Sequence, residues 1–318
     1  MTDPLTIGGV TVKPGQNTYI EIPVAVLPTQ TPLHLPVTVF HGKTPGPCVW
    51  LSAALHGDEL NGVEIIRQVI EQMDVKRLHG TLIAAPIVNV FGFLQQSRYL
   101  PDRRDLNRSF PGSKRGPLAS VLANLFLEEI VRHCTHGIDL HTGSLHRINL
   151  PQVRGNLENT ETLECAEAFG APVIMHAATR DGSLREAAQK RDIPVLLYEA
   201  GEPMRFNDEA ISTGVRGILR VMARLGMRRG QAKRPKHTPT VVRKSQWVRV
   251  RHGGVARMAV TLGQRVRKGQ RLAIVGDAFG HSSADVPAPV AGLVIGHTLN
   301  PLVNRGDAIV HIGEIHQE

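Results

Sequence analysis

Two histidines and one glutamate stand where their side chains could share a metal ion. His56 and Glu59 lie three residues apart in His56-Gly-Asp-Glu59, and His141 follows the apolar segment 137–140. Two imidazoles and one carboxylate are a ligand set of catalytic zinc, whose fourth position stays open for water. A single such motif also matches by chance, and a buried histidine is the ordinary alternative. The set predicts a hydrolytic metal site if the fold brings His141 to the other two.

A polar segment after residue 104 supplies groups that suit an acidic substrate. It reads Asp105-Leu-Asn-Arg-Ser-Phe-Pro-Gly112. Arg108 presents a planar fork for a carboxylate, and Asn107 adds an amide donor. Asp105 could hydrogen-bond a metal-bound imidazole and so fix its tautomer. The same residues could instead form only a turn with a salt bridge.

Arg98 is a candidate for stabilising the oxyanion that forms when water attacks an amide carbonyl. It lies seven residues before Asp105. Arg103 and Arg104 compete for the same role, and an ordinary surface arginine is the alternative for each. The sequence leaves this choice open.

Glu199 is the candidate general base. It ends the apolar run 194–198 and precedes Ala200-Gly201. A hydrolytic zinc site needs one such carboxylate to accept a proton from water. A salt-bridged structural glutamate is the alternative, although an acid directly after apolar residues is uncommon.

The elements that must position these residues alternate between strands and helices. We expect strands over the ranges 48–55, 80–88, 137–141, 172–176 and 194–199. We expect helices over the ranges 59–73, 117–133, 160–169, 183–191 and 209–225. This order predicts an α/β fold with a mostly parallel or mixed sheet covered by helices on both faces. The carboxyl ends of such strands are where sites assemble.

Composition shifts divide the chain into three parts. We expect a catalytic domain over residues 1–226 whose first 45 residues are β-rich, a basic linker at 227–240, and a small β domain at 241–318. The β domain contains two similar halves, which resemble the flattened barrel of biotinyl and lipoyl domains. A carrier domain of that type needs a lysine on the hairpin between the halves, and residues 276–289 contain none. We therefore expect the fold without the carrier role.

The overall composition is that of a soluble globular protein, with 42% hydrophobic and 20% charged residues. We expect a cytoplasmic protein without a membrane partner, because the chain has no apolar run of membrane length and no secretory signal. The three cysteines are widely spaced and predict reduced thiols. The net charge of +9 permits nucleic-acid binding, but only 4% of residues are aromatic. We expect no nucleic-acid partner, and the sequence leaves a homo-oligomer open.

Four ordered motifs resemble the succinylglutamate desuccinylase/aspartoacylase family, a branch of the zinc carboxypeptidase fold. They are Leu55-His-Gly-Asp-Glu59, Asp105-Leu-Asn-Arg-Ser-Phe110, Asp139-Leu-His-Thr142 and Tyr198-Glu-Ala-Gly201. The resemblance spans roughly residues 45–225. It implies zinc-dependent cleavage of a small N-acyl amino acid, of the acetyl or succinyl type, to a carboxylate and a free amine.

The resemblance also implies roles for individual residues. His56, Glu59 and His141 match the ligands of one zinc ion per chain, and Glu199 matches the general base. These roles agree with the chemistry of the residue types, since zinc activates water and a nearby carboxylate takes its proton.

Asn107 and Arg108 match the pair that grips the substrate carboxylate, and Arg98 matches the arginine that polarises the scissile carbonyl. The segment 101–104 lengthens the gap between Arg98 and Asp105 relative to aspartoacylase. This departure favours a subgroup similar to bacterial deacetylases of acyl-diamino acids. A carboxypeptidase of the same fold and a non-catalytic carboxylate-binding relative are the alternatives.

Overall fold

A thirteen-stranded mixed sheet runs through the molecule and is its largest structural element. The computed structural model describes residues 2–228 and 238–315, so most of the expected basic linker lies outside the described residues. The main path across the sheet, from one edge to the other, is β12 (Ser245–Arg249), β19 (Ala308–Glu314), β17 (Gly292–Thr298), β8 (Arg147–Gly155), β10 (Val195–Gly201), β7 (His136–His141), β5 (Thr44–Ala53), β6 (His79–Ala85), β4 (Pro32–His41) and β3 (Gln16–Val26). Three shorter strands extend it, namely β9 (Val173–His176), β11 (Thr240–Val242) and β14 (Arg265–Val266).

The centre of the sheet is parallel, as the alternation of strands and helices predicts. β10 pairs with β7, β7 with β5, and β5 with β6, all in parallel. The flanking strands β8 and β4 join this centre in antiparallel orientation. The expected α/β fold with a mixed sheet is confirmed.

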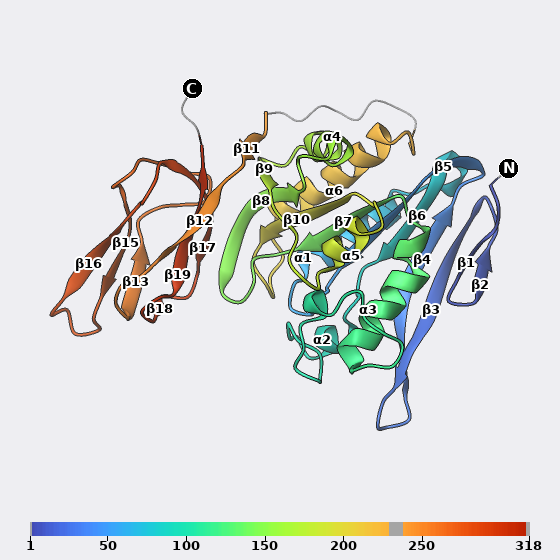
Figure 1. Ribbon diagram of the computed structural model, residues 1–318, viewed down its shortest axis with the longest axis horizontal. Coiled ribbons are helices and arrows are strands. Elements are labelled where there is room, and N and C mark those ends of the chain that lie inside the picture. The colour runs from blue at the N-terminus through green and yellow to red at the C-terminus, as the bar shows by residue number, and fades with distance from the viewer. Residues whose placement is uncertain (1, 229–237, 316–318) are drawn as a thin grey trace.

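Helices cover both faces of the central strands (Figure 1). One hydrophobic cluster joins α1 (Asn61–Glu71), α4 (Thr160–Phe169) and α6 (Asp208–Arg224) to one face. A second cluster joins α3 (Leu118–Glu129) and α5 (Leu184–Gln189) to the other. The remaining helical segments are short, namely α2 (Val90–Leu94), η1 (Val75–Arg77), η2 (Leu106–Arg108) and η3 (Val131–His133). Among the described residues, no helix has the length and apolar character required to cross a membrane.

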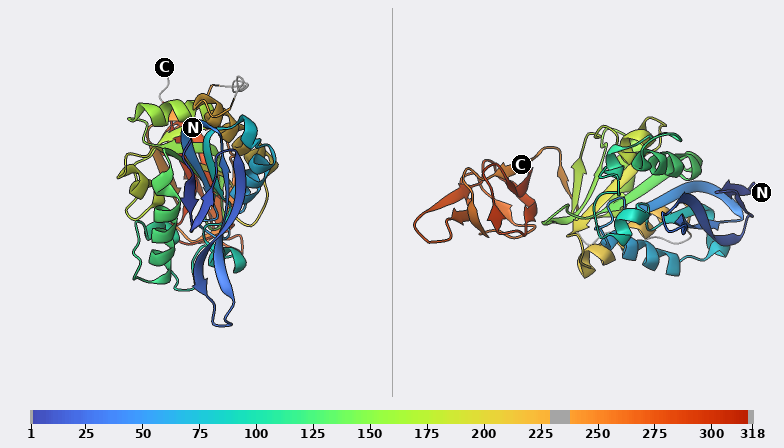
Figure 2. Two further views of the ribbon diagram at one scale, coloured as in Figure 1. Left: turned by 90° about the vertical axis from the view of Figure 1, so that its right-hand side faces the viewer. Right: turned by 90° about the horizontal axis from the view of Figure 1, so that it is seen from below.

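The C-terminal strands carry the expected internal repeat. In the first half, β13 (Gly254–Met258), β14 and β15 (Arg271–Gly276) follow one another, and in the second half β17, β18 (Leu302–Val303) and β19 do. A four-stranded sheet with the order β16-β15-β13-β18, in which β16 spans Ser283–Pro287, completes this part. Its own hydrophobic cluster holds it together. Figure 2 shows these strands at one end of an elongated molecule, opposite β1 (Leu5–Ile7) and β2 (Val10–Val12).

β8 is a strand of the large sheet that was not predicted from the sequence. Its sequence, Arg-Ile-Asn-Leu-Pro-Gln-Val-Arg-Gly, mixes polar residues and a proline into the apolar positions, so it lacks a continuous apolar run. β8 pairs with β10 on one side and with β17 on the other. The central strands of the sheet therefore continue directly into the C-terminal strands, and β8 lies between them.

Candidate active site

His56 reaches the site because the chain turns sharply after β5. Ala54 adopts a positive φ of 49°, which bends the backbone away from the strand. Gly57 then passes so close to α2 that a Cβ there would lie 1.9 Å from the carbonyl carbon of Gly92. Only glycine fits this close approach of two backbone segments. Backbone packing therefore fixes the path of the chain between His56 and Glu59.

The two predicted histidine ligands and the predicted glutamate meet in the structure. The Nδ1 atoms of His56 and His141 lie 2.7 and 2.8 Å from the two carboxylate oxygens of Glu59. All three side chains are buried. Their ligand atoms lie within 4.8 Å of one another, so the group could hold a metal ion. The structure thus brings His141, from a different strand, to the His56–Glu59 pair.

The outer nitrogen of each imidazole faces a second carboxylate. His56 Nε2 lies 3.1 Å from Asp105 Oδ1, and His141 Nε2 lies 2.8 Å from Asp139 Oδ2. When Nε2 carries a proton and donates it to such a carboxylate, Nδ1 keeps its lone pair for a metal ion. Metal-binding histidines in proteins almost always have this support. Asp105 was expected in this position from the sequence, whereas no role was predicted for Asp139.

These contacts shift the ionisation of the buried groups. Burial alone would raise the pKa of Glu59, but the adjacent imidazoles of His56 and His141 outweigh it and hold this pKa well below its usual range. Burial alone would lower the pKa of His141, but the Asp139 and Glu59 carboxylates raise it. The surroundings therefore stabilise a negative charge on Glu59, which a cation site requires.

Arg98 lies beside this group, whereas Arg103 and Arg104 do not line the pocket. Its Nη1 donates to Glu59 Oε1 at 3.3 Å, and its Nη2 donates to Asp105 Oδ2 at 2.9 Å. Two carboxylates therefore hold the guanidinium in one orientation at the edge of the candidate metal group. Arg103 and Arg104 are exposed to solvent.

Asn107 and Arg108 lie in the short helical turn η2 on the same side of the pocket. Asn107 is buried, and its Oδ1 accepts a hydrogen bond from the Leu184 backbone at 2.9 Å. This contact directs the amide nitrogen away from α5. Arg108 donates to the carbonyl oxygen of Asn107 and, among the described residues, forms no ion pair with an acid. Its charge is available to a ligand.

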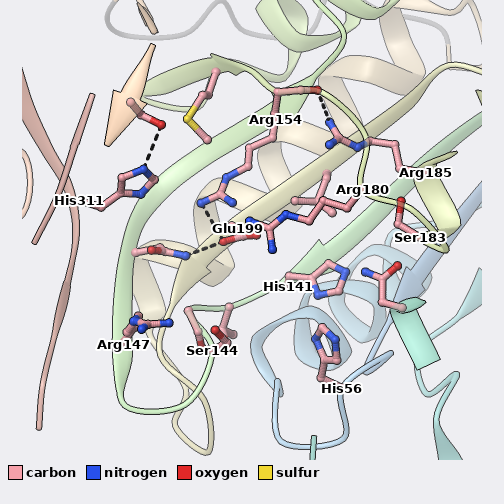
Figure 3. A pocket seen from close by; sticks show the side chains of 18 of the residues that line it. His56, His141, Ser144, Arg147, Arg154, Arg180, Ser183, Arg185, Glu199 and His311 are labelled. Carbon is pink, nitrogen blue, oxygen red and sulfur yellow. Dashed lines mark hydrogen bonds and ion pairs between the residues drawn. The ribbon is translucent and has the colours of Figure 1, made fainter. Parts of the chain in front are cut away.

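Glu199 enters the pocket from the end of β10. Its Oε2 accepts a hydrogen bond from Asn149 at 2.6 Å and an ion pair from Arg154 at 3.1 Å (Figure 3). Within the described parts of the chain, no contact of this kind engages Oε1. The carboxylate is therefore fixed through one of its two oxygens.

The pocket that contains these residues has a volume of about 480 Å³. All seven predicted site residues line it. Several further lining residues were not predicted from the sequence. They carry a positive charge or come from β8 and the C-terminal strands, namely Arg147, Asn149, Arg154, Arg180, Arg185, Trp247 and His311. In the sequence, only the polar residues of β8 pointed to these lining residues. They indicate a pocket only once β8 is known to be a strand.

The C-terminal strands build one wall of the pocket. Trp247 of β12 stacks on His311 of β19, with ring centroids 4.6 Å apart and planes inclined by 12°. The Arg147 guanidinium lies 4.8 Å from the Trp247 ring, a cation–π contact between β8 and this wall. His311 is buried, and its Nδ1 has no hydrogen-bond partner among the described residues. Figure 3 shows His311 at the far side of Glu199 from His141.

Comparisons with known proteins agree with this geometry. Residues 45–225 match the model of the succinylglutamate desuccinylase/aspartoacylase catalytic domain. The chain is 26% identical over 294 residues to an N-alpha-acetyl-L-2,4-diaminobutyric acid deacetylase of Halomonas elongata, covering 88% of this chain and 86% of that protein.

Solved structures extend the similarity over nearly the whole chain. A succinylglutamate desuccinylase/aspartoacylase from Rhodobacter sphaeroides is 25% identical, with a TM-score of 0.85 and coverage of 95% of this chain and 96% of that one. The product-bound ectoine utilization protein EutE (DoeB) from Ruegeria pomeroyi is 23% identical, with a TM-score of 0.87 and 98% coverage of both chains. The second likeness concerns the fold alone, and it includes the C-terminal strands.

Proposed function

Because this chain belongs to the succinylglutamate desuccinylase/aspartoacylase family, we propose that it is a zinc-dependent hydrolase of small N-acyl amino acids. It cleaves the amide bond to a carboxylate and a free amine. The observation that carries the proposal is the buried group of His56, Glu59 and His141, which shares one pocket with Glu199.

The metal assignment rests on the chemistry of the donor set. His56, Glu59 and His141 would hold the ion through two imidazole nitrogens and a carboxylate, which is a catalytic zinc set. Asp105 and Asp139 would fix the two imidazoles from outside. When bound, zinc supplies a Lewis acid that makes water a nucleophile at neutral pH.

Glu199 is the proposed general base. Its Oε1 takes a proton from the attacking water, whose oxygen bonds to the acyl carbon. As the carbon–nitrogen bond breaks, the same oxygen returns the proton to the leaving amine. Asn149 and Arg154 keep the carboxylate in place through Oε2 during both transfers.

Arg98 is the proposed stabiliser of the negative charge on the acyl oxygen. Since Glu59 and Asp105 already fix its guanidinium, little reorganisation accompanies the reaction. Asn107 and Arg108 would grip the carboxylate of the amino acid and so set the position of the scissile bond.

The charge of the pocket favours an acidic substrate. Six arginines line it against two glutamates, Glu59 and Glu199. Four of these arginines, Arg108, Arg147, Arg180 and Arg185, form no ion pair with an acid within the described residues. A pocket with this surplus attracts anions. We therefore propose an N-acetyl or N-succinyl amino acid that carries a second carboxylate, in contrast to the diamino acid named for the Halomonas relative.

A carboxypeptidase activity on peptides is the second candidate, because the fold would support it. The wall formed by β12 and β19 counts against it, since Trp247 and His311 line the pocket and limit the room for a longer chain. A non-catalytic carboxylate-binding role is the third candidate. It would give Glu199 no reaction to assist, and the adjacent group of His56, Glu59 and His141, which could hold a metal ion, argues against that.

A substrate panel tests the proposal. Zinc-loaded protein is incubated with N-acetyl and N-succinyl derivatives of glutamate, aspartate, alanine and 2,4-diaminobutyrate, and with dipeptides, and the released amine is measured. We expect release from the acidic derivatives at the highest kcat/KM. Faster cleavage of dipeptides would favour the peptidase, and preference for the diaminobutyrate derivative would overturn the acidic-substrate proposal while leaving the deacylase intact.

A further inference from the structure

A second group of potential metal ligands lies at the opposite end of β7 from His141. His136 is the first residue of β7, and Glu161 and Cys165 lie one turn apart on α4. His136 Nε2 lies 3.3 Å from Glu161 Oε1, and Cys165 Sγ lies 3.8 Å from the same oxygen. The three ligand atoms all lie within 4.8 Å of one another.

The hydrogen bonds of Thr135 determine which nitrogen of His136 carries the proton. The Thr135 hydroxyl donates its only proton to the carbonyl oxygen of Cys48 at 3.0 Å. The same hydroxyl lies 2.9 Å from His136 Nδ1, so it accepts there and Nδ1 is the donor. In the neutral imidazole, Nε2 therefore keeps a lone pair, and this lone pair faces Glu161 and Cys165.

Two electron-pair donors thus face each other across a short distance. The nearby guanidinium of Arg224 does not offset the repulsion between these two groups, because it pairs with Glu164 instead. A lone pair and a carboxylate oxygen 3.3 Å apart are stabilised when a cation lies between them.

We propose that His136, Glu161 and Cys165 form a second metal site, separate from the catalytic one, for a divalent transition-metal ion such as zinc. Imidazole nitrogen, carboxylate oxygen and cysteine sulfur together suit zinc better than magnesium or calcium, which prefer oxygen ligands alone. The Cys165 thiol releases its proton to solvent when the ion binds. Water supplies the fourth ligand, since the Glu161 side chain is 42% exposed.

The site would have a structural role. It ties the first residue of β7 to α4, while the last residue of β7 is the proposed catalytic ligand His141. A bound ion would thus anchor both ends of the same strand. It would add stability by binding the folded state alone.

Cobalt titration tests this site without interference from the catalytic one. The group of His56, Glu59 and His141 contains no sulfur, so a thiolate-to-cobalt absorption band reports only a cysteine-containing site. We expect the metal-free full-length protein to develop this band on addition of Co²⁺. Zinc should bind with two equivalents per chain, and Cys165→Ser should lose the band and one equivalent. Deacylase activity of the zinc-loaded variant should remain.

Cys134→Ser is the matched control, because Cys134 is also a buried thiol and lies 3.5 Å from Cys48 Sγ. It should keep both the band and the second equivalent. Glu161→Gln, at a partly exposed position, should weaken Co²⁺ binding at least tenfold while it keeps the thiol. Absence of the band in the wild type would overturn the proposal. A band that survives in Cys165→Ser and disappears in Cys134→Ser would place the ion on Cys48 and Cys134 instead.

Discussion

Glu199 and His141 are register partners in the adjacent parallel strands β10 and β7. Partner residues on neighbouring strands direct their side chains to the same face of a sheet. The proposed base and a proposed metal ligand are therefore held next to each other by sheet hydrogen bonds. This relationship depends on no loop, so it should persist when surface segments move.

Glu199→Gln should remove turnover and leave metal binding unchanged. The amide keeps the size of the side chain and an oxygen for Asn149, but it cannot accept a proton. We expect kcat to fall by about 100- to 10,000-fold, the usual contribution of a general base. Amine release and zinc content are measured on the same preparation. Glu202→Gln, at a glutamate paired with Arg205, is the control and should retain activity. Near-wild-type turnover in Glu199→Gln would disprove the base assignment.

Glu59→Ala should lose the catalytic ion. The change removes one proposed ligand and the carboxylate that lies between His56 and His141. Elemental analysis after dialysis should show one equivalent of zinc fewer per chain than the wild type. Glu64→Ala, in the first turn of α1, is the control because Glu64 pairs with Arg67 on the helix surface. Equal zinc content in Glu59→Ala and the wild type would place the catalytic ion elsewhere.

Arg108→Ala should weaken the use of acidic substrates. Hydrogen bonds to a charged group contribute about 1.5–3 kcal/mol, which corresponds to a loss of roughly 10- to 150-fold in kcat/KM. Steady-state kinetics on the best N-acyl amino acid measure this loss. Arg115→Ala, an exposed arginine in the loop before α3, should behave as the wild type. If the two variants had the same kcat/KM, Arg108 would not be the carboxylate anchor.

His311 should make the folded state sensitive to mild acid. Burial, reinforced by Arg154, Arg147 and Arg180, lowers its pKa to about 3. An unfolded histidine has a pKa near ~6.5, so between these values the unfolded state binds more protons and the free energy of unfolding falls as pH falls. Between pH 7 and pH 5, protonation of this histidine in the unfolded state lowers the free energy of unfolding by about 2 kcal/mol.

His311→Phe tests that prediction, because phenylalanine can still stack on Trp247 but does not titrate. Urea unfolding at pH 7 and pH 5 should show a loss in the wild type that is about 2 kcal/mol larger than in the variant. Identical losses would show that protonation of His311 is not linked to unfolding.

Parts of the fold that follow from local apolar patterns could be predicted from the sequence, whereas parts that depend on pairing of distant segments could not. The central parallel strands were predictable because each is a continuous apolar run, buried on both faces. His56, Glu59 and His141 were predictable because they follow such runs directly. β8 was not, since its polar residues face a pocket and its pairing with β17 joins segments far apart in the chain.

The pocket wall was unpredictable for the same reason. Trp247 and His311 reach the site only through the antiparallel pairing of β12 with β19 and of β17 with β8. Local sequence patterns do not predict pairing between strands that are far apart in the chain. The choice of Arg98 over Arg103 and Arg104 likewise needed the structure, because it depends on which guanidinium meets Glu59 and Asp105.

Zinc-dependent release of amine from an N-acyl acidic amino acid tests the central claim most directly. Metal-free protein, protein restored with zinc and zinc-loaded Glu199→Gln are compared on N-acetylglutamate and N-succinylglutamate. We predict release only by the zinc-restored wild type. Equal release by the metal-free protein, or no release from any member of the wider N-acyl panel, would contradict the account.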